Sequence, residues 1–247
     1  MSCTDIADWY LRQRIAVLDL RSATWERARA DLLPPGYEPD VCMRRLAAAG
    51  RLRRIKKGAY VVVDPVRETP LIAVASALYA EMPHHVTTDA ALTFHGLLDQ
   101  PVPTITVVVG RRGRPIAIDG TIVRPVALAS RWLKGADAFE TTVEGFLVRV
   151  AGREQAVVDA LAEPAWMVHG SLLPEVLAAF SDAELTRTAD RSLARSTAAA
   201  QRLGYLLEET GRELPAALRS LRPVRSVLLR PGRRSSAPYS SRWRVYG

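Results

Sequence analysis

The sequence has few of the residues from which disulfide frameworks and metal centres are built. It contains two cysteines, Cys3 and Cys42, and four histidines in 247 residues. A disulfide framework or a cysteine-based zinc site needs more thiols than this. We therefore expect a chain without structural cross-links, which fits a reducing cytoplasm.

Long apolar runs are also missing. No segment approaches the roughly 20 apolar residues that a transmembrane helix needs, and the N-terminus lacks the charged-then-apolar pattern of a secretion signal. No basic amphipathic helix with a bulky apolar face occurs, which makes a membrane surface the weaker candidate partner. With 48% apolar and 24% charged residues, the composition is typical of a globular protein. The sequence predicts a cytoplasmic protein that does not contact membranes.

What the chain does have is positive charge in two segments. Residues 41–63 contain seven Arg or Lys and no acid, and residues 214–247 contain eight arginines and no acid. The stretch between them is net acidic. An ordinary domain flanked by two cationic segments favours a polyanionic partner, and nucleic acid is the usual one.

A helix is predicted from Pro39 to Ala49. Proline at the first helical position loses only an N–H that would have no partner there, and Gly50 supplies the stop. At 3.6 residues per turn, Arg44 points away from the apolar face and Arg45 lies near its edge. The apolar face is expected to comprise Val41, Cys42, Leu46 and Ala49.

A basic hairpin is predicted directly after this helix. Leu52 and Ile55 alternate with basic residues, Gly58 permits the turn, and residues 59–63 form the returning strand. The cations near the turn are Arg51, Arg53, Arg54, Lys56 and Lys57. Two helices predicted before Pro34 complete an order typical of a winged helix-turn-helix domain, whose wing contacts phosphates. The alternative is a solvated cationic hairpin that contacts no nucleic acid.

The rest of the sequence predicts a second, larger domain. Asp64-Pro65 breaks the pattern, so we expect domains at 1–66 and 67–247. The fold class is α+β: an N-terminal winged helix-turn-helix domain, then a mixed α/β domain that ends in a helical segment and a basic C-terminal strand. The predicted strands are 104–109, 116–118, 121–126, 146–150 and 243–246, and the predicted helices are 70–82, 153–161, one opening at Ser181 with Glu184, and 196–210.

A cationic loop follows the first of these strands. It contains Arg111, Arg112 and Arg114, which could form a second contact with DNA or with a partner protein. A solvated turn explains it equally well.

Four residues close in sequence invite a metal interpretation: His84, His85, His95 and Asp89. A zinc site needs three or four convergent ligands with a supporting shell. Packing, and an N-cap at Thr88 or Asp89, explain the segment better. We predict no metal and no cofactor.

A nuclease is the main alternative function, because a winged helix can target such an enzyme to nucleic acid. Metal-dependent cleavage needs converging carboxylates, yet Glu154 and Asp159 lie about 140° apart around their predicted helix. No glycine-rich phosphate loop or nucleophile elbow occurs. We therefore predict no catalytic residues and no enzymatic activity. A third possibility is an interaction protein whose basic tail binds an acidic partner.

Four segments in order resemble the AbiEi family, the antitoxin and transcriptional regulator of type IV (AbiE-like) toxin–antitoxin systems. They are GRLRRIKKGAY at 50–60, TDAALTFHGLL at 88–98, VRVAGREQAVVDAL at 148–161 and QRLGYLLEETG at 201–211. The chain departs from the family in the stretch 25–39. This stretch is longer and contains more proline than the corresponding part of a compact helix-turn-helix.

The resemblance implies a repressor of its own operon that also neutralises a nucleotidyltransferase-like toxin encoded beside it. The implied partners are double-stranded operator DNA, expected to carry inverted repeats, and the cognate toxin. The implied DNA contacts are Arg51, Arg53, Arg54, Lys56, Lys57 and Tyr60 in the wing, and Arg44 and Arg45 in the helix before it.

Overall fold

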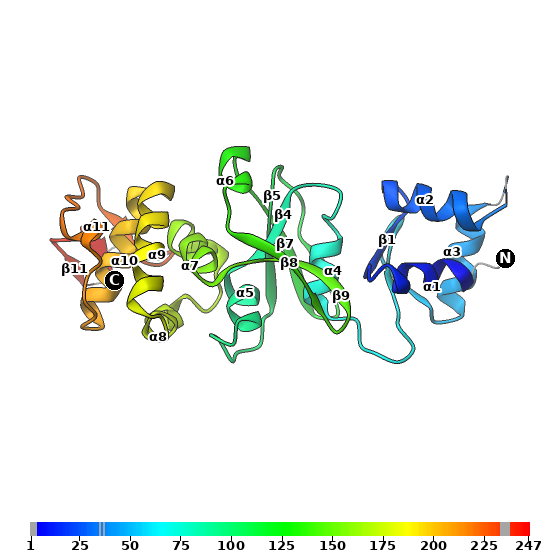
Figure 1. Ribbon diagram of the computed structural model, residues 1–247, viewed down its shortest axis with the longest axis horizontal. Coiled ribbons are helices and arrows are strands. Elements are labelled where there is room, and N and C mark those ends of the chain that lie inside the picture. The colour runs from blue at the N-terminus through cyan, green and yellow to red at the C-terminus, as the bar shows by residue number, and fades with distance from the viewer. Residues whose placement is uncertain (1–3, 35, 37, 233–237) are drawn as a thin grey trace. The chain divides into compact units, whose positions relative to one another are not determined.

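The computed structural model describes all residues except 1–3, 35, 37 and 233–237 (Figure 1). Helices and separate sheets make it an α+β protein, as predicted. The chain forms two compact units. Unit 1 comprises Met1–Val86, Val107–Lys134 and Phe139–Val150, and unit 2 comprises Thr87–Thr106, Gly135–Ala138 and Ala151–Gly247. The division into domains 1–66 and 67–247 stays a prediction.

Unit 1 opens with three helices and a small sheet. In order these are α1 Thr4–Arg12, β1 Val17–Asp19, α2 Ala23–Leu32, α3 Pro39–Ala48, β2 Leu52–Lys56 and β3 Ala59–Val62. The three strands pair antiparallel in the order β1-β3-β2. The sequence did not predict β1, which is only three residues long.

One apolar core holds these six elements together. Its buried members are Ile6, Ala7, Tyr10, Leu18, Trp25, Ala28, Cys42, Met43, Leu46, Leu52 and Val62. Helix α3 therefore buries Met43, whereas Ala49, predicted on the buried face, is exposed. The reason is that α3 ends at Ala48 and Ala49 is its C-cap.

Gly50 ends α3 as predicted. Its φ is +69°, its N–H donates to the Ala47 carbonyl at 3.0 Å, and the Arg51 N–H donates to the Leu46 carbonyl at 2.9 Å. These two bonds form a Schellman motif, in which a left-handed residue follows the helix. A residue with a side chain would be strained at this φ, so Gly50 sets the direction in which the chain enters β2.

The remainder of unit 1 contains α4 Leu71–Ala77, α6 Ser130–Lys134 and most of a six-stranded sheet. The strands are β4 His84–Thr87, β5 Thr104–Val109, β6 Ile116–Ile118, β7 Thr121–Ala127, β8 Ala138–Val143 and β9 Phe146–Ala151. Their order across the sheet is β6-β7-β5-β4-β9-β8, with β4 parallel to β9 and β6 antiparallel to β7. Edge strand β8 was not predicted, because its half-exposed residues lack an apolar pattern.

Unit 2 is mainly helical. Its elements are α5 Thr88–Phe94, α7 Arg153–Ala162, the 3-10 turns Pro164–Trp166 and Gly170–Leu172, α8 Leu173–Ala178, α9 Asp182–Arg195, α10 Thr197–Glu209, α11 Ala216–Arg219, β10 Val227–Leu228, β11 Tyr239–Ser240 and β12 Val245–Tyr246. Helices α7, α9 and α10 pack on one another (Figure 1). The predicted capping box of Ser181 and Glu184 opens α9. None of the helices within the described ranges is long and apolar enough to cross a bilayer.

The C-terminal sheet is fixed to α10 by Trp243. The indole is buried, its Nε1 donates to Glu208 Oε2 at 2.7 Å, and the Trp243 carbonyl accepts from Gln201 Nε2 at 2.8 Å. Gln201, Gly204 and Glu208 share one face of α10 because they are three and four residues apart. A Cβ at Gly204 would lie 2.3 Å from the Trp243 ring. The helix therefore needs glycine here for the ring to reach its backbone.

Candidate nucleic-acid interface

Helix α3 presents two of the predicted DNA-binding residues. Arg44 and Arg45 are exposed, and so are Ala47 and Ala48 in the last turn of α3. Arg44 Nε donates to the Asp40 carbonyl one turn earlier at 3.3 Å, which directs the side chain along the helix. The exposed face of α3 thus carries long cations beside small side chains that leave the helix backbone accessible.

Strand alternation in β2, followed by a register shift after Arg54, decides where its basic residues point. Leu52 and Ile55 are three residues apart, so they cannot share a face of a regular strand. The pairing with β3 shifts between Arg54 and Lys56, which is a β-bulge. Arg53 lies opposite Val61 and Arg54 opposite Tyr60. The two adjacent arginines therefore point to opposite faces of the sheet.

Arg54 and Lys57 lie on the accessible part of the hairpin. Arg54 is exposed and shares its face with Tyr60, which packs partly against the helical core. Lys57 is exposed in the turn, where Gly58 has φ +78°. In the described part of the chain, Arg44, Arg54 and Lys57 form no ion pair.

Two other predicted residues are engaged by carboxylates. Arg51 pairs through Nη2 with Asp8 Oδ1 of α1, and its side chain is only 20% exposed. Arg53 pairs through Nη1 with Asp119 Oδ1, in the turn between β6 and β7. Both arginines thus have partners far away in the sequence, which no local pattern could indicate.

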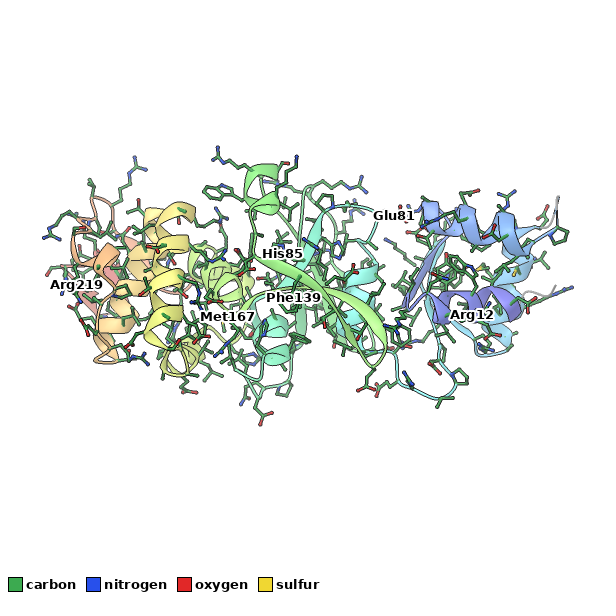
Figure 2. All side chains as sticks on the ribbon, viewed as in Figure 1. Arg12, Glu81, His85, Phe139, Met167 and Arg219 are labelled. Atoms are coloured by element: carbon green, nitrogen blue, oxygen red, sulfur yellow. The ribbon has the colours of Figure 1, made fainter. Side chains whose placement is uncertain are left out.

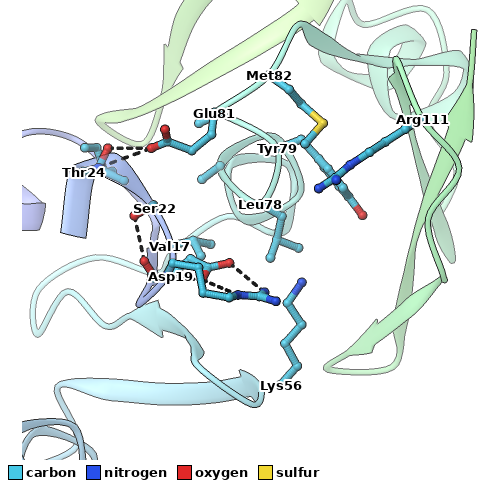
Figure 3. A pocket seen from close by; sticks show the side chains of 14 residues that line it. Val17, Asp19, Ser22, Thr24, Lys56, Leu78, Tyr79, Glu81, Met82 and Arg111 are labelled. Atoms are coloured by element: carbon cyan, nitrogen blue, oxygen red, sulfur yellow. Dashed lines mark hydrogen bonds and ion pairs between the residues drawn. The ribbon is translucent and has the colours of Figure 1, made fainter. Parts of the chain in front are cut away.

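Lys56 and Arg111 line a common pocket in unit 1 (Figure 3). The cavity has a volume of about 290 Å³, and its wall includes Asp19, Arg21 and Tyr79. Arg21 Nε contacts Asp19 Oδ1 at 3.2 Å, and burial raises the pKa of the Tyr79 hydroxyl. The structure therefore brings together two cations that the sequence placed in separate motifs. The other two arginines of the β5–β6 loop, Arg112 and Arg114, are exposed.

The histidines considered as metal ligands have other partners. The His84 ring contacts Ser76 Oγ through Nε2 and the Met82 carbonyl through Nδ1, both at 2.9 Å. Burial lowers the His84 pKa, so its neutral form is favoured. His95 Nε2 contacts the Ala151 carbonyl at 2.8 Å. Among the described residues, no group of three or more His, Cys, Asp or Glu side chains could hold a metal ion.

The N-cap prediction for α5 was wrong. The N-cap is Thr87, without a side-chain capping bond, and α5 begins at Thr88 with φ +50°. Asp89 is fully buried and accepts from the backbone N–H groups of Val168 and His169, and its Oδ1 also contacts His169 Nδ1, each at 2.8 Å. The carboxylate holds a distant loop in place instead of capping its own helix.

The carboxylates tested for a nuclease site also have separate partners. Glu154 forms an ion pair with Arg187. Asp159 is fully buried and accepts from Thr87 Oγ1 at 2.7 Å and Gln155 Nε2 at 2.9 Å. These contacts give each carboxylate a structural role in unit 2.

Comparison with family models finds no match, and no curated protein is similar enough to match. Among solved structures, the chain is similar to the crystal structure of the RV2827C protein from Mycobacterium tuberculosis. The TM-score is 0.63 at 20% sequence identity, over 98% of this chain and 90% of that chain. At this identity the similarity extends to the fold alone.

Proposed function

We propose that the protein is a DNA-binding transcriptional autorepressor and the antitoxin to a nucleotidyltransferase-like toxin encoded beside it. The observation that carries the DNA-binding half is the placement of Arg44, Arg54 and Lys57. These three exposed cations lie on α3 and on the hairpin that follows it, and no ion pair within the described ranges neutralises them. Such cations are available to phosphates and base edges.

The order of elements supports the assignment of residues 4–62 as a winged helix-turn-helix domain. The chain has a helix, a strand, two helices and a hairpin, with a three-stranded antiparallel sheet, which is the order expected of such a domain. In such domains the third helix enters the major groove and the hairpin lies on the backbone. We assign α3 as the recognition helix and β2–β3 as the wing. Arg44 then contacts base edges, while Arg54 and Lys57 contact phosphates.

The antitoxin half is supported by the resemblance of the four segments to the AbiEi family. Three of them fall on α5, on β9 with α7, and on α10. These three segments contain Asp89, Asp159 and Gly204, each of which has a structural role described above. These residues stabilise the fold of this part of the chain, and the co-expression experiment below tests its action on a toxin.

Binding to promoter DNA tests the first half. We expect the full chain to prefer a duplex from its own promoter over a scrambled duplex in fluorescence anisotropy. Arg44→Ala should cost about 1–3 kcal/mol on promoter DNA and little on scrambled DNA, because alanine cannot reach the base edge. Arg131→Ala, at an exposed arginine of α6, is the control with the same charge change. Equal binding of both duplexes by the native chain would contradict a specific repressor.

Co-expression tests the second half. We expect the full chain to restore growth of cells that express the neighbouring gene's product. The Arg44→Ala variant should restore growth equally well from an unrelated promoter, since base contact is not needed for neutralisation. Growth arrest that persists with the native chain present would overturn the antitoxin assignment and leave the DNA-binding one standing.

A further inference from the structure

Four arginines surround one pocket in the C-terminal part of unit 2. The cavity has a volume of about 470 Å³ and is lined by Arg219, Leu221, Arg222, Pro223, Ser241, Arg242 and Arg244. Arg219, labelled in Figure 2, ends α11, and the other three arginines follow α11 or flank Trp243. Among the residues that the structure describes, no acidic side chain lines the cavity. Such a wall attracts an anion.

Backbone carbonyls hold two of these arginines in position. Arg219 Nε donates to the Leu214 carbonyl at 3.0 Å, and Arg222 Nη1 donates to the Arg219 and Leu221 carbonyls at 3.1 and 3.0 Å. A guanidinium has five N–H donors, so these anchors leave others for a ligand. Fixing the side chains beforehand reduces the entropy lost on binding.

Arg244 is positioned by its neighbours. Trp243 and Val245 are both buried, and the Arg244 carbonyl accepts from the Val227 N–H at 2.8 Å. Arg244 itself is exposed, with φ +52°. Holding a non-glycine residue in this region is energetically unfavourable. The buried neighbours sustain this conformation at the wall of the pocket.

The positive charge of the pocket is only partly neutralised. Glu213 pairs with Arg219, and Glu208 pairs with Arg242. All four side chains are at least 43% exposed, and ion pairs this exposed contribute little to stability. An incoming anion can therefore replace the carboxylates at low cost. Among the described residues, no carboxylate pairs with Arg222 or Arg244.

We propose that this pocket binds phosphate groups, supplied either by a nucleotide or by a nucleic-acid strand. Guanidinium groups match phosphate oxygens with two parallel hydrogen bonds, and four of them can contact consecutive phosphates. The site shares no residue with the α3 and hairpin cations of unit 1. Arg233 and Arg234, also in the basic C-terminal segment, lie outside the described residues, and the site does not include them.

The test compares two double variants of the full chain that lose the same charge. Arg222→Gln with Arg244→Gln removes the two arginines of the pocket that have no carboxylate partner in the described structure. Arg225→Gln with Arg230→Gln removes two exposed arginines of the same segment that do not line the pocket. Both are made in a background carrying Arg44→Gln, Arg54→Gln and Lys57→Gln, so that the main contacts of the proposed DNA-binding surface are absent from both.

Sodium tripolyphosphate and a random single-stranded oligonucleotide are titrated into each protein by calorimetry. We expect the pocket variant to lose roughly 100-fold in affinity, because two charge-assisted hydrogen bonds of about 1.5 kcal/mol are removed, and the control variant to change little. Binding of tripolyphosphate identifies a nucleotide-type ligand, and binding of the strand alone identifies a nucleic acid.

Several outcomes would overturn the proposal. One is equal loss in both variants, which means that the charge acts diffusely. Another is a parent protein that binds polyglutamate but neither phosphate probe, which identifies an acidic protein partner instead. Thermal melts of all variants show whether weaker binding reflects unfolding, and Arg222→Lys with Arg244→Lys adds a folded comparison. The two lysines keep the positive charges but lack the paired N–H donors of a guanidinium. Native affinity in this variant would therefore also contradict guanidinium recognition.

Discussion

Replacing Arg44, Arg54 and Lys57 together by glutamine is expected to weaken promoter binding roughly 1000-fold. Each side chain is exposed and lacks an ion-pair partner in the described structure. A hydrogen bond to a charged group contributes about 1.5–3 kcal/mol, and each 1.4 kcal/mol is a factor of about ten in affinity. The slope of log affinity against log salt should also fall by roughly 0.9 for every phosphate that the variant no longer neutralises. Anisotropy titrations over a range of salt concentrations measure both quantities.

A second triple variant makes this result specific. Replacing Arg51, Arg53 and Lys56 by glutamine removes the same charge from the same basic segment. Two of these residues already pair with Asp8 and Asp119, and Lys56 lines the unit 1 pocket. We expect a much smaller loss of DNA affinity, with some loss of thermal stability from the broken ion pairs. Equal losses of affinity in the two variants would mean that the basic segment acts only by its total charge.

Gly204→Ala is expected to destabilise the protein by about 3 kcal/mol. Alanine inside a helix is normally more favourable than glycine by roughly 0.5–1 kcal/mol. The substitution is therefore expected to destabilise the protein where it would ordinarily stabilise a helix. The reason is the Trp243 ring, which a Cβ would approach to 2.3 Å. Overpacking a filled site costs typically about 1–3 kcal/mol, and displacing the ring also breaks its bond to Glu208. Urea unfolding of the full chain gives the free energy.

Gly170→Ala is the matched control for this variant. A Cβ there has no neighbour within 4 Å and the backbone φ is not positive, so we expect no loss or a small gain. A second comparison combines Gly204→Ala with Trp243→Leu, which should restore part of the stability by removing the clash. A stability gain in Gly204→Ala alone would contradict the proposed fit between α10 and the ring.

Local patterns in the sequence were sufficient to predict α3, Gly50 and the hairpin. The apolar spacing and the glycine at the helix end act within one or two turns of chain, so the sequence shows them directly. Strands β1 and β8 were missed because one is three residues long and the other carries mixed half-exposed side chains. Neither gives the two-residue alternation from which a strand is predicted.

The sequence was sufficient to predict which cations belong to the candidate site. It did not indicate which of them pair with carboxylates and which stay exposed. Asp8 lies 43 residues before Arg51, and Asp119 is separated from Arg53 by helices α4 and α5 and strands β3 to β6. These pairs form only when the chain folds, so the local sequence does not reveal them. Asp89 shows the same limit: it precedes an apolar helix as a capping residue would, yet it binds backbone N–H groups 79 and 80 residues further along.

The alternation of side chains along β2 gives two identical neighbours different constraints on mutation. Arg53 is tied to Asp119, so a change at either position leaves the other charge without its partner. Arg54 has no such tie in the described structure and faces the proposed DNA side. Mutation at Arg54 can therefore change DNA affinity without disturbing the pair that Arg53 forms, although only one peptide bond separates them.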